Sequence, residues 1–161
     1  MLRTERLLLR RARTDDVSAL HAIMRQPLAM RYWSTLPHPD VAATRTFIDS
    51  MMNPPHEGSD DFIIECEGRV IGKLGCWRLP DVGYILDPAE WGRGYASEAL
   101  AAFIKHRRAQ GGTELTADTD PRNSASIHLL ERHGFVETGS AARTWLVGDE
   151  WCDSIYWKLE L

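Results

Sequence analysis

Two glycines, Gly92 and Gly94, stand one residue apart between a strand-like run and a helical pattern. Glycine lets the backbone approach a ligand closely, and the first N–H groups of a helix have no partner inside that helix. The N–H groups of residues 92–97 and the positive end of the helix dipole would together favour an anion, most often a phosphate. A helix start that is capped only by water is the alternative interpretation.

The spacing of the glycines disfavours two common nucleotide sites. A dinucleotide-binding fingerprint would need a third glycine at position 97, where Ser97 stands. A P-loop would end in Gly-Lys followed by Ser or Thr, and this segment lacks that ending. A nucleotide-dependent oxidoreductase and an NTPase are therefore remote possibilities.

The apolar spacing predicts the elements that must hold this turn. Thr14 and Asp40 are expected to cap two helices, and Gly68 to supply the positive φ of a tight hairpin turn. We expect strands over residues 7–11, 62–67, 70–77, 81–87, 114–118, from 135 and over 152–159, with further helices over residues 96–110 and 124–133. No repeat or linker interrupts this order, which predicts one mixed α/β domain over residues 1–161 with helices on the sheet faces.

Composition limits the class of protein. The chain has 161 residues, of which 43% are hydrophobic and 26% charged, and its formal net charge is −4. These values are typical of a soluble globular protein and give no general attraction to nucleic acid or acidic membranes. Three widely spaced cysteines form no CxxC or Cys/His pattern, so we expect no metal site and a reduced, cytoplasmic protein.

A second motif lies about thirty residues beyond the glycines. Asn123 and Ser126 open a helix that ends in Glu131-Arg132-His133-Gly134-Phe135. Together with WGRGYA at residues 91–96, this segment resembles the GNAT superfamily of acetyl-coenzyme A dependent N-acetyltransferases. The N-terminal TERLLLRRARTDD is similar to the RimJ/RimL branch, which acetylates the N-termini of ribosomal proteins. Trp91 stands where the wider superfamily has Gln or Arg, as is frequent in this branch.

The resemblance implies a mostly antiparallel mixed sheet that is splayed between its fourth and fifth strands, with helices on both faces. The acetyl group would sit in that opening, the backbone of Ile85 and Leu86 would pair with the pantetheine arm, and a backbone N–H would polarise the thioester carbonyl. Ser126 would lie near the thioester sulfur. The implied residues of the acetyl-coenzyme A site are Ile85, Leu86, Trp91, Gly92, Arg93, Gly94, Tyr95, Ala96, Ser97, Asn123 and Ser126.

Acetyl transfer to an amine requires a proton acceptor and a stabilised leaving thiolate. A free α-amine has a pKa of about 8, so a weak base suffices, whereas a lysine with a pKa of about 10.4 needs stronger help. Asp81 is our first choice of base, and an ordinary turn acid is the alternative; Glu65, Glu150 and Asp153 are weaker candidates. Ser126 would give the thiolate a hydrogen bond or only cap its helix.

No histidine stands in a triad context with a serine or cysteine, so direct attack in a ternary complex is favoured over a covalent acetyl-enzyme. The acceptor would be a protein N-terminus or a small amine, bound by a monomer or a homodimer. Tyr32 and Trp33, in an irregular stretch, are the expected acceptor-side residues, and Trp77, Trp145 and Trp151 are further candidates. A coenzyme A-binding or sensing module with little catalysis is the alternative function.

Overall fold

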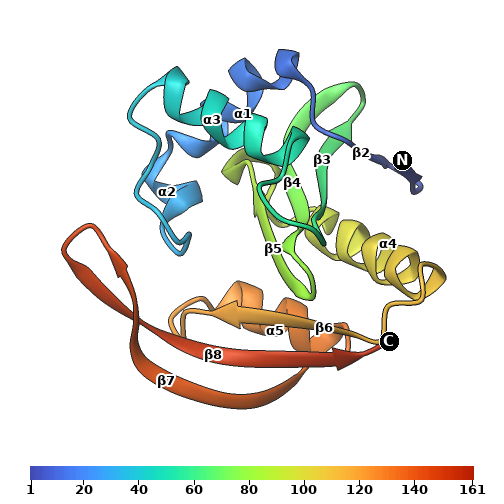
Figure 1. Cartoon of the computed structure of the whole chain (residues 1–161), viewed down its shortest axis with the longest axis vertical. Helices are drawn as coiled ribbons and strands as arrows, with labels where there is room; N and C mark the ends of the chain where they lie inside the picture. The colour runs from blue at the N-terminus through green and yellow to red at the C-terminus, as the bar shows by residue number, and fades with distance from the viewer.

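The computed structural model describes residues 1–161 and is organised around one eight-stranded sheet (Figure 1). The strands lie in the order β1-β2-β3-β4-β5-β6-β8-β7, and every neighbouring pair is antiparallel except β5 and β6. The strands are β1 (Leu2–Arg3), β2 (Leu7–Arg10), β3 (Asp60–Cys66), β4 (Arg69–Arg78), β5 (Asp81–Leu86), β6 (Glu114–Thr119), β7 (Val136–Val147) and β8 (Glu150–Glu160). This is the mixed, mostly antiparallel α/β sheet that the sequence predicts.

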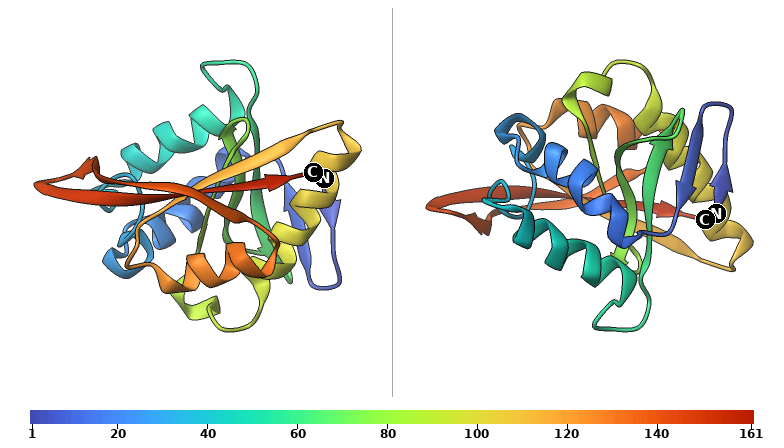
Figure 2. Two further views of the ribbon diagram at one scale, coloured as in Figure 1. Left: turned by 90° about the horizontal axis from the view of Figure 1, so that it is seen from below. Right: turned by 90° about the horizontal axis from the view of Figure 1, so that it is seen from above.

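Helices cover both faces of the sheet (Figure 2). The helices are α1 (Val17–Met24), α2 (Pro27–Met30), α3 (Val41–Met52), α4 (Tyr95–Ala109) and α5 (Ser124–Arg132), with 3-10 turns η1 (Thr14–Asp16) and η2 (Pro88–Glu90). On one face, α4 and α5 bury a large cluster that includes Leu100, Phe103 and Leu130. On the other, α1, α2 and α3 bury a smaller cluster around Ile48 and Ile85. Strand β5 therefore contributes side chains to two separate cores.

The sheet is splayed between β5 and β6. The only pair of residues that joins these two strands is Asp81 with Thr116, after which they separate. Because the two-residue strand β1 precedes the strands expected from the sequence, the fourth and fifth predicted strands are β5 and β6. The predicted position of the splay is confirmed.

At Gly72, the backbones of β4 and β5 lie so close together that no side chain fits between them. A Cβ at this position would lie 2.1 Å from the carbonyl oxygen of Ile85. Real atoms do not approach so closely, so a glycine is required here. The absent side chain lets the β5 backbone lie against β4 beside the splay.

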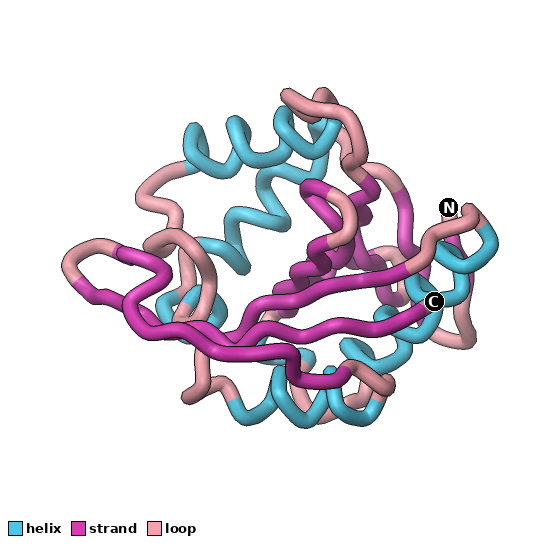
Figure 3. The backbone as a smooth tube through the Cα atoms, turned by 60° about the horizontal axis from the view of Figure 1, so that its bottom comes forward, coloured by secondary structure: helices cyan, strands magenta, loops and turns pink.

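Local predictions largely hold. The β3–β4 turn has positive φ at Glu67 and Gly68, and Asp40 caps α3 by accepting a hydrogen bond from Ala43 N at 2.9 Å. The prediction that Thr14 caps the first helix is wrong, because Thr14 begins η1 and the Asp16 carboxylate accepts from Arg13 N at 2.7 Å. Strands β7 and β8 form a long hairpin that extends past the rest of the sheet (Figure 3). No helix is long and apolar enough to cross a membrane.

Candidate functional site

The glycine turn leads into α4 as the sequence predicts. Gly92 and Gly94 have φ of 75° and 80°, a conformation that favours glycine. Gly94 is the N-cap of α4 and offers no side chain to the helix, so the first N–H groups of α4 receive no side-chain cap. A Cβ on Gly92 would meet nothing within 4 Å, so the outer side of the turn is open. The turn can therefore accept an anion.

Arg6, far away in sequence, holds this turn in place. Its Nη1 donates to the carbonyl oxygen of Arg93 at 2.9 Å, and its guanidinium lies 4.6 Å from the centre of the Tyr95 ring. Glu98 in the first turn of α4 accepts from Arg6 Nε at 2.7 Å and from Arg6 N at 2.9 Å, and it also accepts from the Thr4 hydroxyl. Sequence reasoning missed Arg6, which reads in isolation as one of several solvated charges near the N-terminus.

The other turn residues have mixed environments. Trp91 is 48% exposed, and its Nε1 donates to the carbonyl oxygen of Leu86 at 3.1 Å, which ties the turn to the end of β5. Arg93 lies 3.4 Å from the Glu90 carboxylate, so part of its charge is already compensated. The backbone of the turn is thus its more available anion-binding feature.

Alternation along β5 shows which backbone groups face the splay. Ile85 stands opposite Lys73 of β4, and Asp87 N donates to the carbonyl oxygen of Ile71 at 2.8 Å. In an antiparallel ladder the groups of every second residue point toward the same neighbour, so residues 85 and 87 point toward β4. The backbone of Tyr84 and Leu86 then faces the gap, which favours these two residues over Ile85 as backbone partners of a ligand there.

The side chains of Asn123 and Ser126 contact each other at the start of α5. Ser126 N donates to Asn123 Oδ1 at 3.3 Å, and Asn123 Nδ2 donates to Ser126 Oγ at 3.1 Å. Asn123 is therefore the helix cap, and the serine hydroxyl hydrogen is left free to donate elsewhere. The structure thus assigns the capping role to Asn123 and not to Ser126, for which a helix cap was the alternative role.

A serine and a histidine do pair in this region, contrary to the expectation from the sequence. Ser97 Oγ and His133 Nε2 lie 2.7 Å apart and join the start of α4 to the end of α5. Burial, reinforced by Arg132, lowers the pKa of His133, so this imidazole is neutral near pH 7. No carboxylate orients the ring, and the pair fixes two helices rather than forming a triad.

A cleft of about 190 Å³ opens on the side of β5 that faces α2. It brings together three predicted residues, Tyr32, Trp33 and Asp81. A Cβ on Gly83 would lie 3.9 Å from the Trp33 ring, so the indole stands directly against β5. The other lining residues are Arg31, Ser34, Val82, Gly83, Asp118, Asp120, Trp145, Val147, Cys152 and Asp153.

Carboxylates dominate the polar lining of the cleft. Burial of its carboxyl group raises the pKa of Asp81, a hydrogen bond from Thr116 opposes this shift, and the charge of Asp118 adds to it. Asp118 accepts from Trp145 Nε1 at 2.8 Å and from the Ser154 hydroxyl at 2.9 Å, with no cation as partner. A raised pKa is what a carboxylate base for an amine requires. Sequence reasoning did not single out Asp118, because strand β6 has no motif that would mark it.

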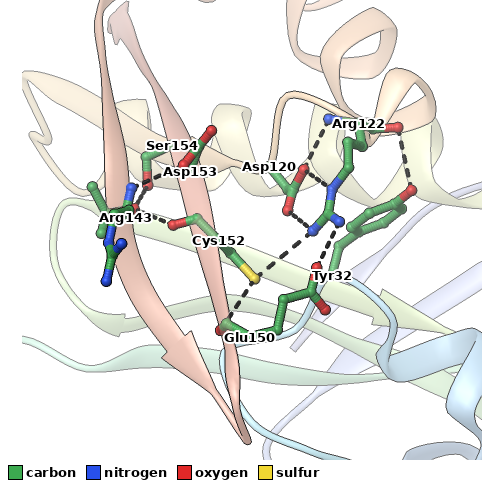
Figure 4. Close-up of polar contacts among 9 residues, drawn as sticks. Tyr32, Asp120, Arg122, Arg143, Glu150, Cys152, Asp153 and Ser154 are labelled. Atoms are coloured by element: carbon green, nitrogen blue, oxygen red, sulfur yellow. Dashed lines mark hydrogen bonds and ion pairs between the residues drawn. The ribbon is translucent and has the colours of Figure 1, made fainter.

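One arginine and its partners form the rim of the cleft (Figure 4). Arg122 contacts Asp120 at 2.6 Å and Glu150 at 2.7 Å, and its carbonyl oxygen accepts from the Tyr32 hydroxyl at 3.3 Å. Hydrogen bonds from Arg122 lower the pKa of Asp120 despite its burial. Asp120 and Glu150 are therefore held as ion-paired carboxylates and are poor candidates for a base.

The remaining candidates divide between the cleft and other regions. Asp153 lines the cleft and accepts from Arg143 N at 2.8 Å, whereas Glu65 is bound to Arg10 at 2.6 Å outside the lining. Trp145 lines the cleft, but Trp77 packs against His56 with ring centres 4.1 Å apart. Trp151 packs instead near Arg143. Ser126 and the glycine turn lie outside this lining, so the residues predicted for the cofactor and those predicted for the acceptor lie in different parts of the molecule.

Known proteins resemble this chain along its length. The model of the acetyltransferase (GNAT) domain matches residues 6–136. An uncharacterized N-acetyltransferase p20 from Bacillus licheniformis is 30% identical over 152 residues, which cover 86% of this chain and 83% of the relative.

Solved structures share the fold. The RimL ribosomal L7/L12 alpha-N-protein acetyltransferase in complex with coenzyme A has a TM-score of 0.87 at 21% identity, covering 98% of this chain and 96% of that one. Spermidine N-acetyltransferase from Vibrio cholerae, in complex with coenzyme A and spermine, has a TM-score of 0.83 at 18% identity, covering 98% and 96%. With the domain match across most of its length, this chain belongs to the GNAT acetyltransferase family.

Proposed function

We propose that this protein transfers the acetyl group of acetyl-coenzyme A directly to a primary amine, which is recognised as a cation and attacks in its neutral form. The observation that carries the proposal is the arrangement around β5. An acidic cleft opens beside this strand, and it contains Asp81, a carboxylate whose pKa is raised. The open glycine turn and the Asn123–Ser126 pair lie outside the lining of this cleft, so the cofactor and the amine would bind in different places. Relatives of the same fold are named for coenzyme A complexes and for amine acceptors, which supports both halves.

The residues present fit coenzyme A. The N–H groups of residues 92–97 would hold its pyrophosphate at the start of α4, and the backbone of Tyr84 and Leu86 would pair with the pantetheine arm in the splay. When bound, acetyl-coenzyme A supplies a thioester, whose acetyl carbon bonds to the amine nitrogen as its bond to sulfur breaks and the electron pair leaves with the sulfur.

The amine nitrogen loses two protons between its ammonium form and the amide. One leaves to solvent before the attack, because an ammonium ion has no lone pair, and Asp81 would accept the second as the bond to the acetyl carbon forms. Most amine molecules arrive protonated near pH 7, and the carboxylates of Asp81, Asp118 and Asp153 have no cationic side chain as partner in the cleft. The cleft therefore attracts ammonium groups, and the side chains of Trp33 and Trp145 contribute to its lining. Ser126 would donate its free hydroxyl hydrogen to the departing sulfur.

The cysteines do not favour a covalent acetyl-enzyme. Cys66 and Cys76 are buried in the core, and burial strongly raises the pKa of the Cys76 thiol. Cys152 alone reaches the cleft lining, with its Sγ 3.8 Å from Arg122 Nη2. Replacing Cys152 by serine should leave turnover intact, and loss of turnover in a folded variant that still binds coenzyme A would contradict direct transfer.

A thiol-release assay with acetyl-coenzyme A tests the function. The acceptor panel should contain peptides that begin with Ala, Ser or Thr, peptides with only a lysine amine, and small diamines and polyamines. We expect release with cationic acceptors and weaker release when a carboxylate lies next to the amine. Calorimetric binding of coenzyme A without thiol release across the panel would instead indicate a binding module.

A further inference from the structure

The hydroxyl group of Tyr84 is buried and has no partner. Tyr84 lies in β5 opposite Leu74, and its ring packs against the large core cluster. Its Oη has no contact with solvent and forms no hydrogen bond of ordinary geometry. Burying an unsatisfied hydroxyl costs about 1–3 kcal/mol, so packing alone would be better served by phenylalanine.

The hydroxyl of Ser126 is a polar neighbour of this group. Burial raises the pKa of Tyr84 to about 12, and Ser126, as a hydrogen-bonding neighbour, acts in the opposite direction. Tyr84 is therefore a neutral phenol, and a donor, throughout the range in which enzymes work. Because Asn123 donates to Ser126 Oγ, the serine hydrogen is also free. Two hydroxyl groups whose hydrogens form no hydrogen bond of ordinary geometry thus lie in the same region of the molecule.

These hydroxyl groups and Asp81 are separated by β5. Val82, Tyr84 and Leu86 pack against the cluster under α4 and α5, whereas Ile85 packs against the cluster that includes Trp33. Asp81 is three residues before Tyr84, and alternation places the two side chains on opposite faces of the strand. A thioester bound at the edge of β5 would therefore have the carboxylate of Asp81 on one face of the strand and the two hydroxyl groups on the other.

We propose that Tyr84 Oη is a second hydrogen-bond donor, beside Ser126 Oγ, to the sulfur that leaves in acetyl transfer. This inference rests on the proposed function. Asp81 takes the amine proton, and the two hydroxyl groups offset the negative charge that the broken carbon–sulfur bond leaves on sulfur. Tyr84 keeps its own proton and is regenerated unchanged. The bound thioester also satisfies the hydroxyl that the free protein leaves without a partner.

Tyr84→Phe is the direct test, because it removes one oxygen and keeps the ring. We expect kcat to fall about 100-fold, at the lower end of the range found for losing one donor to a developing charge. The dissociation constant of coenzyme A, measured by calorimetry, should change less than about threefold, since the interaction is made mainly as charge develops. The melting temperature of the free protein should be unchanged or raised, because an unsatisfied buried hydroxyl is lost.

Tyr156→Phe is the matched control, since Tyr156 is an exposed tyrosine in β8, and it should match the wild type in all three measurements. A normal kcat for Tyr84→Phe would overturn the inference while the proposed function stands. A lower melting temperature together with similar losses of kcat and of coenzyme A affinity would also overturn it, because such losses indicate a structural role. Weaker coenzyme A binding with normal kcat would mean that Tyr84 anchors the cofactor arm instead. Failure of the wild type to release thiol would overturn the proposed function and this inference together.

Discussion

Two aspartates that flank the same end of β4 have opposite surroundings. Asp60 stands opposite Cys76 on one side of β4, and Asp81 stands opposite Arg78 on the other. Asp60 contacts Arg11 at 2.9 Å, His106 at 3.0 Å and Arg107 at 2.8 Å, whereas Asp81 has only the Thr116 hydroxyl at 3.3 Å. The fold compensates one carboxylate fully and leaves the other available to an external cation.

The pKa values of the two groups follow this difference. Burial alone would raise the pKa of Asp60, but hydrogen bonds from Arg107 and Arg11 outweigh it and lower the pKa. At Asp81 burial prevails, and Asp118 adds a like charge. The comparison separates a carboxylate that stabilises the fold from one suited to receive a proton.

The largest expected effect is on catalysis at Asp81. Asp81→Asn should lower kcat/KM for the amine by about 10²- to 10⁴-fold, because the base is lost, and should leave the melting temperature close to that of the wild type. In the wild type, kcat/KM should rise with pH through the raised pKa of Asp81, since only the carboxylate accepts a proton. Kinetics from pH 5 to 9 would show that the step due to Asp81 is absent in the variant, whereas the rise caused by deprotonation of the amine remains. A larger loss in Asp153→Asn would assign the base to that residue instead.

The next effect is on stability at Asp60. Asp60→Asn should lower the free energy of unfolding by about 1–3 kcal/mol, because Arg107, whose side chain is 14% exposed, and the more exposed Arg11 lose their carboxylate partner. The folded-state pKa of Asp60 is lowered, so its contribution is present above the unfolded value near 3.9 and is lost as pH falls through the folded value. Urea unfolding at pH 7 and at acid pH measures both the loss of stability and its dependence on pH. We expect a normal kcat in the folded Asp60→Asn variant. A reduced kcat would contradict the view that Asp60 stabilises the fold whereas Asp81 acts in catalysis.

The smallest effect is expected at Arg6, which connects the N-terminal segment to the glycine turn. Arg6→Ala should weaken coenzyme A binding about tenfold, because the turn loses its support. Calorimetry measures the affinity, and Arg3→Ala in β1 is the control of equal charge. If both variants weaken binding equally, the effect is general electrostatics and Arg6 has no specific contact role.

The sequence predicted the features that depend on neighbours in the chain. The left-handed glycines of the turn, the β3–β4 hairpin and the cap at Asp40 all rest on local backbone requirements. The contacts of Arg6 with Glu98, across 92 residues, are set by the folded arrangement of β2 and α4. The same holds for Asp118, whose place in the cleft depends on the separation of β5 from β6. Asp60 and Asp81 are the same type of residue, and they acquire different roles only once the sheet has formed.

The single rung between Asp81 and Thr116 has a mechanical consequence. Two half-sheets meet at one backbone bridge, and the seam is otherwise held by side chains such as Val82, Leu86 and Leu115 in the shared core. Apolar packing is non-directional, whereas a hydrogen-bonded ladder fixes both distance and angle. The seam can therefore flex as a hinge does. A ligand that pairs with the free edge of β5 would stiffen the seam, because it would supply hydrogen bonds that a neighbouring strand would otherwise make.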